Sequence, residues 1–371
     1  MSRVALLAAL LLALPLALHA ADAPAPKPGK PLLFAAYYIW YETDASPGNI
    51  RPWRPWMKDG QPPVGPGGPT AEQTASSAWP LIGLYNSRDP VVTDWHVRLA
   101  KAAGLDAFLV SWFGEERMFT SFELLLEKAG KHGLKVARFD ELAQFQPDWD
   151  RYKAEIVAFL KKYSKHPAYL NIDGRPAIYL YQTAPGRLTP AQFAELKAHV
   201  EESCGAMYWI MDKLAHDGAA YGRGDQDRIK HIPAEWLQTP GIDSFGFYST
   251  FSHFRANTYP ELAGKYATLS RLAHQAGKKM LLPVHPGHDN SRFSKSPYVM
   301  ERRDGQTLRD YLKAATDAQA DFVLVTSWNE WPETTVVEPS STWPDPYLYL
   351  KILAEWKGVP FVPPALPGAA K

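Results

Sequence analysis

Short apolar runs alternate with amphipathic segments along most of this chain, and the alternation repeats eight times. The runs are rich in aliphatic, β-branched and aromatic residues, which is typical of buried strands in a parallel sheet. The predicted strands span residues 32–41, 106–112, 135–139, 176–181, 207–211, 242–248, 279–284 and 321–328.

Amphipathic helices are predicted between these strands, and several carry a start or stop signal. Asp89 and Thr189 each precede a proline, which is the pattern of an N-cap followed by proline at the first helical position. Gly277 is predicted to follow the end of a helix, and Asp345 with Pro346 to start the last one. After the first of these caps, apolar residues recur on one helical face at Val92, Trp95, Leu99 and Ala102.

Eight strand-then-helix units predict an α/β fold, a single (β/α)8 TIM barrel, over residues 32–360. A doubly wound open sheet is the alternative, but no glycine-rich dinucleotide-binding turn follows any predicted strand. No boundary between two compact domains is visible. Residues 361–371 are predicted to form a flexible tail.

One connection is much longer than the others. Residues 42–88 follow the first predicted strand and are rich in proline, glycine and tryptophan. Structureless loops beyond about 12–15 residues are uncommon. A loop after a barrel strand lies at the C-terminal face, where the active sites of TIM barrels are built. We therefore favour a functional loop over a decorative insertion.

Composition narrows the class of protein. The chain of 371 residues is 46% hydrophobic, which is ample for a core. Its 40 Lys+Arg and 39 Asp+Glu leave a net charge of +1, which argues against a nucleic-acid partner because such proteins need a concentrated basic face. An aromatic content of 13% suits a sugar-binding cleft as well as a core.

The first residues predict export. Arg3 precedes an apolar run over residues 4–18, and residues 1–20 resemble a signal peptide that is cleaved after Ala20. The run is shorter than the ~20 residues that cross a bilayer, so no stable membrane insertion is expected after cleavage. Residues 21–31 are a proline-rich leader, and Cys204 is the only cysteine, so no intramolecular disulfide can form. The mature protein is predicted to be a periplasmic or secreted monomer.

The most informative stretch follows the eighth predicted strand. It contains Asn329, Glu330, Trp331 and Glu333, so two carboxylates three residues apart lie between tryptophans. Glycoside cleavage usually uses two carboxyl groups that flank the bond. Neighbouring indoles can raise a carboxyl pKa toward that of a general acid. The alternative is that both glutamates are solvated loop residues.

The ends of the other strands supply residues that a barrel would bring to the same pocket. They suit a neutral, polyhydroxylated ligand. His285, His288 and Asp289 match metal-site spacing only loosely, so we expect no metal and no cofactor. Instead we expect His288 and Asp289 to bind hydroxyl groups, and Arg292 to contact Glu330 or a substrate oxygen. The predicted substrate-binding residues are Tyr37, Tyr38, Trp56, Trp112, Tyr181, Tyr248, His288, Asp289, Arg292, Asn329 and Trp331.

Motifs near both ends of the barrel resemble one known family. The early motifs are residues 84–90, Trp95-His96 and residues 103–112, and the late ones are residues 286–292 and 327–339. Together they resemble glycoside hydrolase family 99, with its family 71/99-like relatives, which are (β/α)8 endo-α-mannosidases. The resemblance implies an oligo- or polysaccharide substrate with α-linkages, such as an α-mannan or a bacterial exopolysaccharide.

The resemblance also implies a retaining mechanism without an enzyme nucleophile. One glutamate deprotonates the sugar 2-hydroxyl, which attacks its own anomeric carbon, and a second protonates the leaving oxygen and then activates water. By resemblance Glu330 takes the first role and Glu333 the second, so we expect Glu333 to have the higher pKa.

The sequence departs from the family pattern at three positions near the sugar. Pro332 and Pro55 each stand where the family has histidine, and His288 stands where it has tyrosine. Both carboxylates are retained, which favours an active glycosidase of altered specificity. A non-catalytic carbohydrate-binding or polysaccharide-assembly protein on the same barrel is the alternative.

Overall fold

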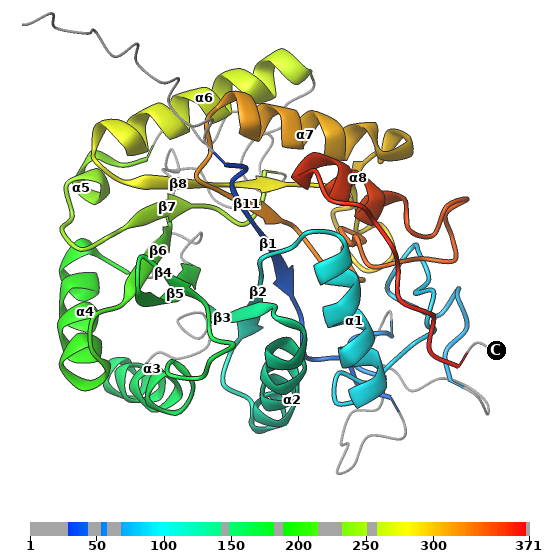
Figure 1. Cartoon of the computed structure of the whole chain (residues 1–371), viewed down its shortest axis with the longest axis horizontal. Helices are drawn as coiled ribbons and strands as arrows, with labels where there is room; N and C mark the ends of the chain where they lie inside the picture. The colour runs from blue at the N-terminus through cyan, green and yellow to red at the C-terminus, as the bar shows by residue number, and fades with distance from the viewer. Residues whose placement is uncertain are drawn as a thin grey trace, which may run out of the picture. The chain divides into compact units, whose positions relative to one another are not determined.

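The computed structural model describes residues 29–43, 53–57, 68–141, 148–181, 188–213, 232–250 and 258–368. Within these residues the parallel strands close into a barrel, because β3 pairs with β5 and β1 pairs with β11 (Figure 1). The predicted (β/α)8 TIM barrel is therefore confirmed. Its strands are β1 (Leu32–Tyr37), β2 (Ala107–Trp112), β3 (Lys135–Asp140), β5 (Arg175–Tyr181), β6 (Tyr208–Asp212), β7 (Ser244–Gly246), β8 (Lys279–Val284) and β11 (Phe322–Val325).

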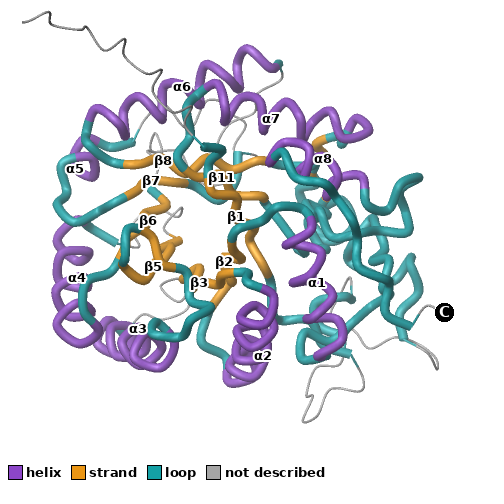
Figure 2. The backbone as a smooth tube through the Cα atoms, viewed as in Figure 1, coloured by secondary structure: helices purple, strands orange, loops and turns teal. Residues whose placement is uncertain are grey.

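The helices lie outside the ring of strands, as Figure 2 shows. They cover the outer surface of the sheet, which explains why β11 is buried along its whole length. The helices are α1 (Pro90–Ala102), α2 (Glu116–His132), α3 (Trp149–Tyr163), α4 (Pro190–Cys204), α5 (Ala234–Leu237), α6 (Tyr259–Gln275), α7 (Gln306–Asp317) and α8 (Leu348–Lys357).

The barrel also carries short additional elements. The two-residue strand β4 (Asn171–Ile172) pairs antiparallel with β5. A hairpin of β9 (His288–Asp289) and β10 (Val299–Met300) follows β8, and the 3-10 helix η2 (Arg303–Gly305) precedes α7. The hairpin lies in the loop after a barrel strand, so it belongs to the C-terminal face where a site is expected.

Most predicted helix signals are confirmed. The side chain of Asp89 accepts hydrogen bonds from backbone N–H groups in the first turn of α1, and Thr189 forms a capping box at α4. Gly277 follows the C-cap of α6 with a φ of 69°, the left-handed conformation that glycine adopts easily. The last helix starts later than predicted, because Asp345 accepts from the N–H of Tyr347 in a turn before α8.

Three predicted strands are clearly shorter in the structure, and one of them, predicted over residues 242–248, is only Ser244–Gly246. β1 ends at Tyr37 and β11 at Val325, whereas both were expected to continue for three or four more residues. Beyond Tyr37 the backbone N–H of Tyr38 binds the side chain of Asn329 instead of a neighbouring strand. The residues expected at these strand ends therefore belong to loops, which can direct side chains into a pocket.

The described part of the long connection after β1 packs against the loop after β11. Leu81 donates its backbone N–H to the carbonyl of Pro339 at 2.8 Å, and Pro80 forms a bridge with Ser340. Trp56 is buried at 1% exposure. The connection thus lies beside the stretch that carries the two glutamates, as its predicted functional role requires.

The two ends of the chain are only partly described. The predicted signal peptide and most of the leader fall on residues 1–28, outside the described residues. In the predicted tail, Phe361 and Leu366 pack partly buried against the core. Within the described ranges, no helix is both long and apolar enough to cross a membrane.

Candidate active site

The two glutamates lie in the loop that follows β11, and this loop folds back on itself. The N–H of Val337 donates to the carbonyl of Ser327 at 3.0 Å, and the hydroxyl of Ser327 accepts from the N–H of Glu330 at 2.7 Å. The carbonyl of Glu333 accepts from the N–H of Asp289 in β9 at 2.8 Å. Both glutamates are therefore placed by backbone hydrogen bonds around them, on a loop continuous with a buried strand.

Two tyrosines from other strands face these carboxyl groups. The hydroxyls of Tyr38 and Tyr248 lie 2.7 Å apart. Burial raises the pKa of each well above its ordinary value, and the negative charges of Glu330 and Glu333 raise it further. A charge acts this strongly only at short range, so both hydroxyls belong to the pocket with the carboxyl pair.

A third carboxyl group, which the predicted site lacks, belongs to Glu141 just after β3. The hydroxyl of Ser111 donates to its Oε1 at 2.5 Å, and its backbone N–H donates to the carbonyl of Trp112. Its charge raises the pKa of both Glu330 and Glu333. The available sequence signal was its place directly after a predicted strand, at the same face as the pair.

Burial and mutual repulsion keep protons on the glutamate pair. Burial, followed by the charge of Glu141, raises the pKa of Glu333 to about 7. Glu330 is only 6% exposed, and burial, then Glu333, then Glu141 raise its pKa well above the ordinary range. The expectation that Glu333 has the higher pKa stays a prediction, since burial raises both values and the charge of Glu333 acts on Glu330 in addition to that of Glu141.

One oxygen of the pair has unused hydrogen-bonding capacity. Oε2 of Glu333 is buried and meets no hydrogen-bond partner among the residues that the structure describes. Buried polar atoms are nearly always paired, so each exception calls for an explanation. A carboxyl oxygen of this kind can donate a proton to a ligand oxygen that enters the pocket.

Tyr181 completes the aromatic wall near the pair. Its half-buried ring lies 5.9 Å from that of Tyr248 and 5.2 Å from that of Phe139, measured between centroids. Of the predicted substrate-binding residues, the structure thus gathers Tyr38, Tyr181 and Tyr248 around the carboxyl groups. Rings with hydroxyl groups present both an apolar face and a hydrogen-bonding tip to a sugar.

Two of the predicted substrate-binding residues face the outer helices instead. Trp112 is fully buried, packs on Phe122 and Phe159, and donates its indole N–H to Glu155 of α3. Tyr37 lies with its hydroxyl 3.0 Å from Nδ1 of His96 in α1. Successive side chains of a strand point to opposite faces, so their neighbours Ser111 and Tyr38 face the pocket and the prediction is corrected.

Three further predicted residues form a buried layer that supports the loop. Trp56 packs its ring 4.2 Å from that of Tyr41 and 6.3 Å from that of Trp331. Trp331 and Asn329 are 0% exposed, and the amide of Asn329 bridges the backbone N–H and carbonyl of Tyr38. The polar groups of these side chains bind other groups of the protein, so we infer that they support the loop and do not contact the sugar directly.

The hairpin after β8 carries the last three predicted residues. His288 is 2% exposed, and burial lowers its pKa to about 4, so the imidazole is neutral at pH 7. Burial raises the pKa of Asp289, but hydrogen bonds from Ser291 and Ser77 outweigh it and lower the value. Hydroxyl binding by His288 and Asp289 stays a prediction.

Arg292 is not bound to Glu330. Its guanidinium donates to the carbonyl of Ala71 in the long connection after β1, and its charge helps to lower the pKa of Glu72. The predicted pairing with Glu330 is therefore wrong, because the hairpin directs this side chain toward the connection. Contact with a substrate oxygen at the rim stays a prediction.

The histidines near β8 are engaged with the protein. Nε2 of His285 accepts from the N–H of Thr250 at 3.1 Å, and burial lowers the pKa of His285 to about 3. Within the ranges that the structure describes, no three or more His, Cys, Asp or Glu side chains are grouped so as to hold a metal. The site geometry is thus built from carboxyl, hydroxyl and aromatic groups.

A closed (β/α)8 barrel with a buried pair of carboxyl groups at its C-terminal mouth, faced by tyrosine hydroxyls, defines a glycosidase. The comparison with known families agrees. The chain belongs to glycosyl hydrolase family 99, whose model matches residues 30–352.

Relatives of known activity or structure are distant but extend over most of the chain. The glycoprotein endo-alpha-1,2-mannosidase of Rattus norvegicus is 22% identical over 87% of this chain and 73% of its own length. The enzyme of that name from Xenopus laevis is 24% identical over 86% of this chain and 75% of its own. The solved GH99 endo-alpha-mannosidase from Bacteroides thetaiotaomicron matches with a TM-score of 0.69 at 23% identity, covering 87% of this chain and 96% of that one. This last likeness shows the shared fold.

Proposed function

We propose that this protein is an exported, retaining endo-α-mannosidase that cleaves inside an α-linked mannose glycan. The observation that carries the proposal is the buried pair of Glu330 and Glu333, both with raised pKa values, facing Tyr38 and Tyr248. Membership of family 99 and relatives named endo-alpha-1,2-mannosidases support the mannose class.

In the first step Glu330 removes the proton from the 2-hydroxyl of the sugar. O2 then forms a bond to the anomeric carbon while the bond from that carbon to the leaving oxygen breaks. Glu333 donates its proton to the leaving oxygen. An axial 2-hydroxyl, as in mannose, is placed for attack from the face opposite an α-linked leaving group, so geometry supplies much of the rate.

In the second step Glu333, now a carboxylate, removes a proton from water. The water oxygen bonds to the anomeric carbon, the bond from that carbon to O2 breaks, and O2 regains its proton from Glu330. The two inversions leave the configuration at the anomeric carbon unchanged, which is retention. Each glutamate ends in the protonation state in which it began.

Substrate binding must favour an ionised Glu330. Burial, then repulsion from Glu333 and Glu141, raises the pKa of Glu330, whereas the reaction needs Glu330 ionised and Glu333 protonated. A hydrogen bond from the sugar 2-hydroxyl to Glu330 stabilises its charged form and lowers its pKa. The proton then resides on Glu333, whose raised pKa suits an acid near neutral pH.

Alanine substitutions combined with two leaving groups test this assignment. Glu333→Ala should lose ~10²–10⁴-fold in rate on an α-1,2-linked manno-oligosaccharide, because its sugar leaving group needs a proton. The same variant should retain more first-step rate on a mannosyl fluoride, whose leaving group needs none. Glu330→Ala should fail on both substrates, because no activated 2-hydroxyl remains to attack.

Wild-type turnover in both variants would overturn this mechanism. A wild-type protein that binds the manno-oligosaccharide but cleaves neither substrate would instead favour a carbohydrate-binding protein. Product analysis by NMR completes the test, since a retaining enzyme releases the α-anomer first.

A further inference from the structure

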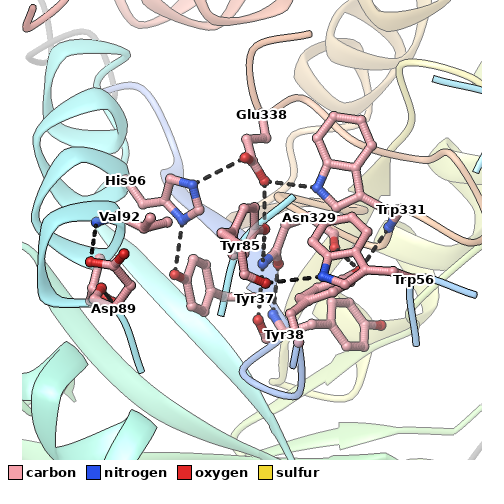
Figure 3. A network of polar contacts seen from close by, with 12 residues as sticks. Tyr37, Tyr38, Trp56, Tyr85, Asp89, Val92, His96, Asn329, Trp331 and Glu338 are labelled. Atoms are coloured by element: carbon pink, nitrogen blue, oxygen red, sulfur yellow. Dashed lines mark hydrogen bonds and ion pairs between the residues drawn. The ribbon is translucent and has the colours of Figure 1, made fainter. Parts of the chain in front are cut away.

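The loop that carries the two glutamates contains a further buried carboxyl group, which the proposed reaction does not use. The side chains of Glu338 and His96 are both 0% exposed, and Oε1 of Glu338 lies 3.1 Å from Nε2 of His96 (Figure 3). Oε2 accepts hydrogen bonds from the Tyr85 hydroxyl at 2.8 Å and from the Trp331 indole N–H at 2.9 Å. A buried polar group is costly unless it is hydrogen-bonded, and both oxygens of this carboxyl group have partners.

The two donors on Oε2 lead to the two neighbours of Glu330 in the chain. Trp331 binds this oxygen directly. The Tyr85 hydroxyl accepts from the side-chain amide of Asn329 at 3.1 Å, and Asn329 in turn bridges the backbone of Tyr38. Glu330 therefore lies between two residues that are tied to a single carboxylate.

His96 extends these contacts to the outer helices. The hydroxyl of Tyr37 lies 3.0 Å from Nδ1 of His96. When this hydroxyl donates to Nδ1, the ring proton resides on Nε2 and points to Glu338, which then accepts from three donors. The sequence separation between His96 and Glu338 is 242 residues, so this contact joins α1 to the loop after β11.

We propose that Glu338 and His96 are positioning residues that hold Glu330 in the geometry required for reaction; this inference rests on the proposed role of Glu330. The contacts reach both flanks of Glu330 and anchor them to β1 and α1. A misplacement of about 1 Å in an active site can cost ~10²-fold in rate. Glu338 acts through the hydrogen bonds that it accepts from the Tyr85 hydroxyl and the Trp331 indole N–H.

The first test compares Glu338→Gln with a matched control. Glutamine keeps the shape, but its amide nitrogen cannot accept the hydrogen bonds that one carboxylate oxygen accepts. The control is Glu201→Gln in α4, where a carboxylate likewise accepts from an indole, that of Trp209, at 3.0 Å. On the α-1,2-linked manno-oligosaccharide we expect kcat to fall ~10²-fold in Glu338→Gln with KM within about threefold, and neither to change in the control.

The pH–rate profile separates positioning from simple stabilisation. When Glu330 is no longer held beside Glu333, the repulsion between them weakens and the two apparent pKa values of the pair draw together. Loss of fold stability alone would lower Tm and leave the profile of the folded protein unchanged. We therefore expect an altered profile in Glu338→Gln and a wild-type profile in Glu201→Gln.

Trp331→Phe provides a second variant in case Glu338→Gln fails to fold. It removes the indole N–H and retains an aromatic ring, and we expect a loss of ~10-fold or more in kcat with the same change in the pH profile. The fold-loss of kcat in the double variant should be smaller than the product of the two single fold-losses, because both substitutions break the same hydrogen bond, from Trp331 to Glu338.

The outcomes distinguish this inference from the proposed function. If Glu330→Gln keeps wild-type turnover, the role of Glu330 fails and the inference fails with it. If Glu330→Gln is inactive while the folded Glu338 and Trp331 variants keep wild-type kcat and pH profile, only the inference is overturned. Losses that multiply independently in the double variant would also overturn it.

Discussion

At the scale of single residues, buried carboxyl groups are the main chemical feature of this protein. Besides the glutamate pair, Asp212 at the end of β6 is 0% exposed. Burial raises its pKa to about 8, although hydrogen bonds from the Tyr179 hydroxyl and the Tyr248 N–H act in the opposite direction. Asp212 is therefore mostly neutral at pH 7, and it holds the backbone of Tyr248 at the pocket.

Asp212→Asn should stabilise the protein at alkaline pH. When a carboxyl group has a raised pKa in the folded state, the protein loses stability as pH rises from the unfolded pKa of that group to its folded pKa. For Asp212 this range runs from 3.8 to about 8. Between pH 5 and pH 8 the loss is at most about 4 kcal/mol, at ~1.4 kcal/mol per pH unit. Melting curves should show a variant Tm above that of the wild type at pH 8 and a smaller difference at pH 5. Asp89→Asn, which keeps the cap of α1, is the control, and an equal gain at both pH values would contradict the prediction.

The titration order of the pair can be measured directly. Burial and the charge of Glu141 raise the pKa of Glu333, so Glu330→Gln should leave it near its value of about 7. Glu333→Gln removes a charge that Glu330 faces, so the pKa of Glu330 should fall, while burial and Glu141 keep it above the ordinary range. Carbon-13 NMR of labelled glutamate side chains measures both pKa values. A large fall in the pKa of Glu333 in Glu330→Gln would show the opposite order.

At the scale of elements, the loop after β11 depends on a half-buried arginine. The guanidinium of Arg302 lies 4.6 Å from the ring of Trp343 and 4.7 Å from that of Tyr349. It donates to the carbonyls of Thr334 at 2.6 Å and Val336 at 3.1 Å. Thr334 has a φ of 48°, which a β-branched residue adopts only under constraint. Arg302 supplies part of that constraint beside Glu333.

Arg302→Lys should therefore weaken both stability and turnover. Lysine has no planar group to pack against the two rings and cannot donate to two carbonyls in a fixed fork, so we expect a loss of about 2 kcal/mol in unfolding free energy. Misplacement of Glu333 should lower kcat in parallel. Denaturant unfolding and kinetics measure the two effects. Arg309→Lys, in an exposed pair with Glu355, is the control and should change stability by less than about 1 kcal/mol. Equal losses of unfolding free energy in Arg302→Lys and Arg309→Lys would contradict the role of Arg302 in holding the loop.

At the scale of the whole molecule, the predicted signal peptide and the barrel occupy separate parts of the chain. The barrel starts at β1, so cleavage of the predicted signal peptide, residues 1–20, leaves every described strand intact. We expect the chain expressed in a Gram-negative host to be recovered from the periplasm with Ala21 as its first residue, because Leu18-His19-Ala20 follows the apolar run as a plausible cleavage site. Intact-mass measurement of the fractionated protein decides this. A chain that keeps residues 1–20 and stays in the cytoplasm would contradict it.

Much of the architecture follows from the sequence because the relevant signals are local. All eight predicted barrel strands are present, within a few residues at their ends, and the caps at Asp89 and Thr189 lie where proline and polar residues predict them. The pair of Glu330 and Glu333 was also visible, since both residues belong to one contiguous stretch after a strand. Hydrophobic period, caps and short motifs act within a few residues, so a single sequence contains them.

Only the tertiary structure decided which side chains face the pocket. A strand buried on both faces is apolar throughout, so its sequence does not show which of two neighbours points inward. This is why Trp112 was expected in the site in place of Ser111, and why Tyr37 was expected there together with Tyr38, although only Tyr38 faces the pocket. Glu141 joins the carboxyl pair, and His96 meets Glu338, only because closure of the barrel brings together strands and helices that lie far apart in the sequence.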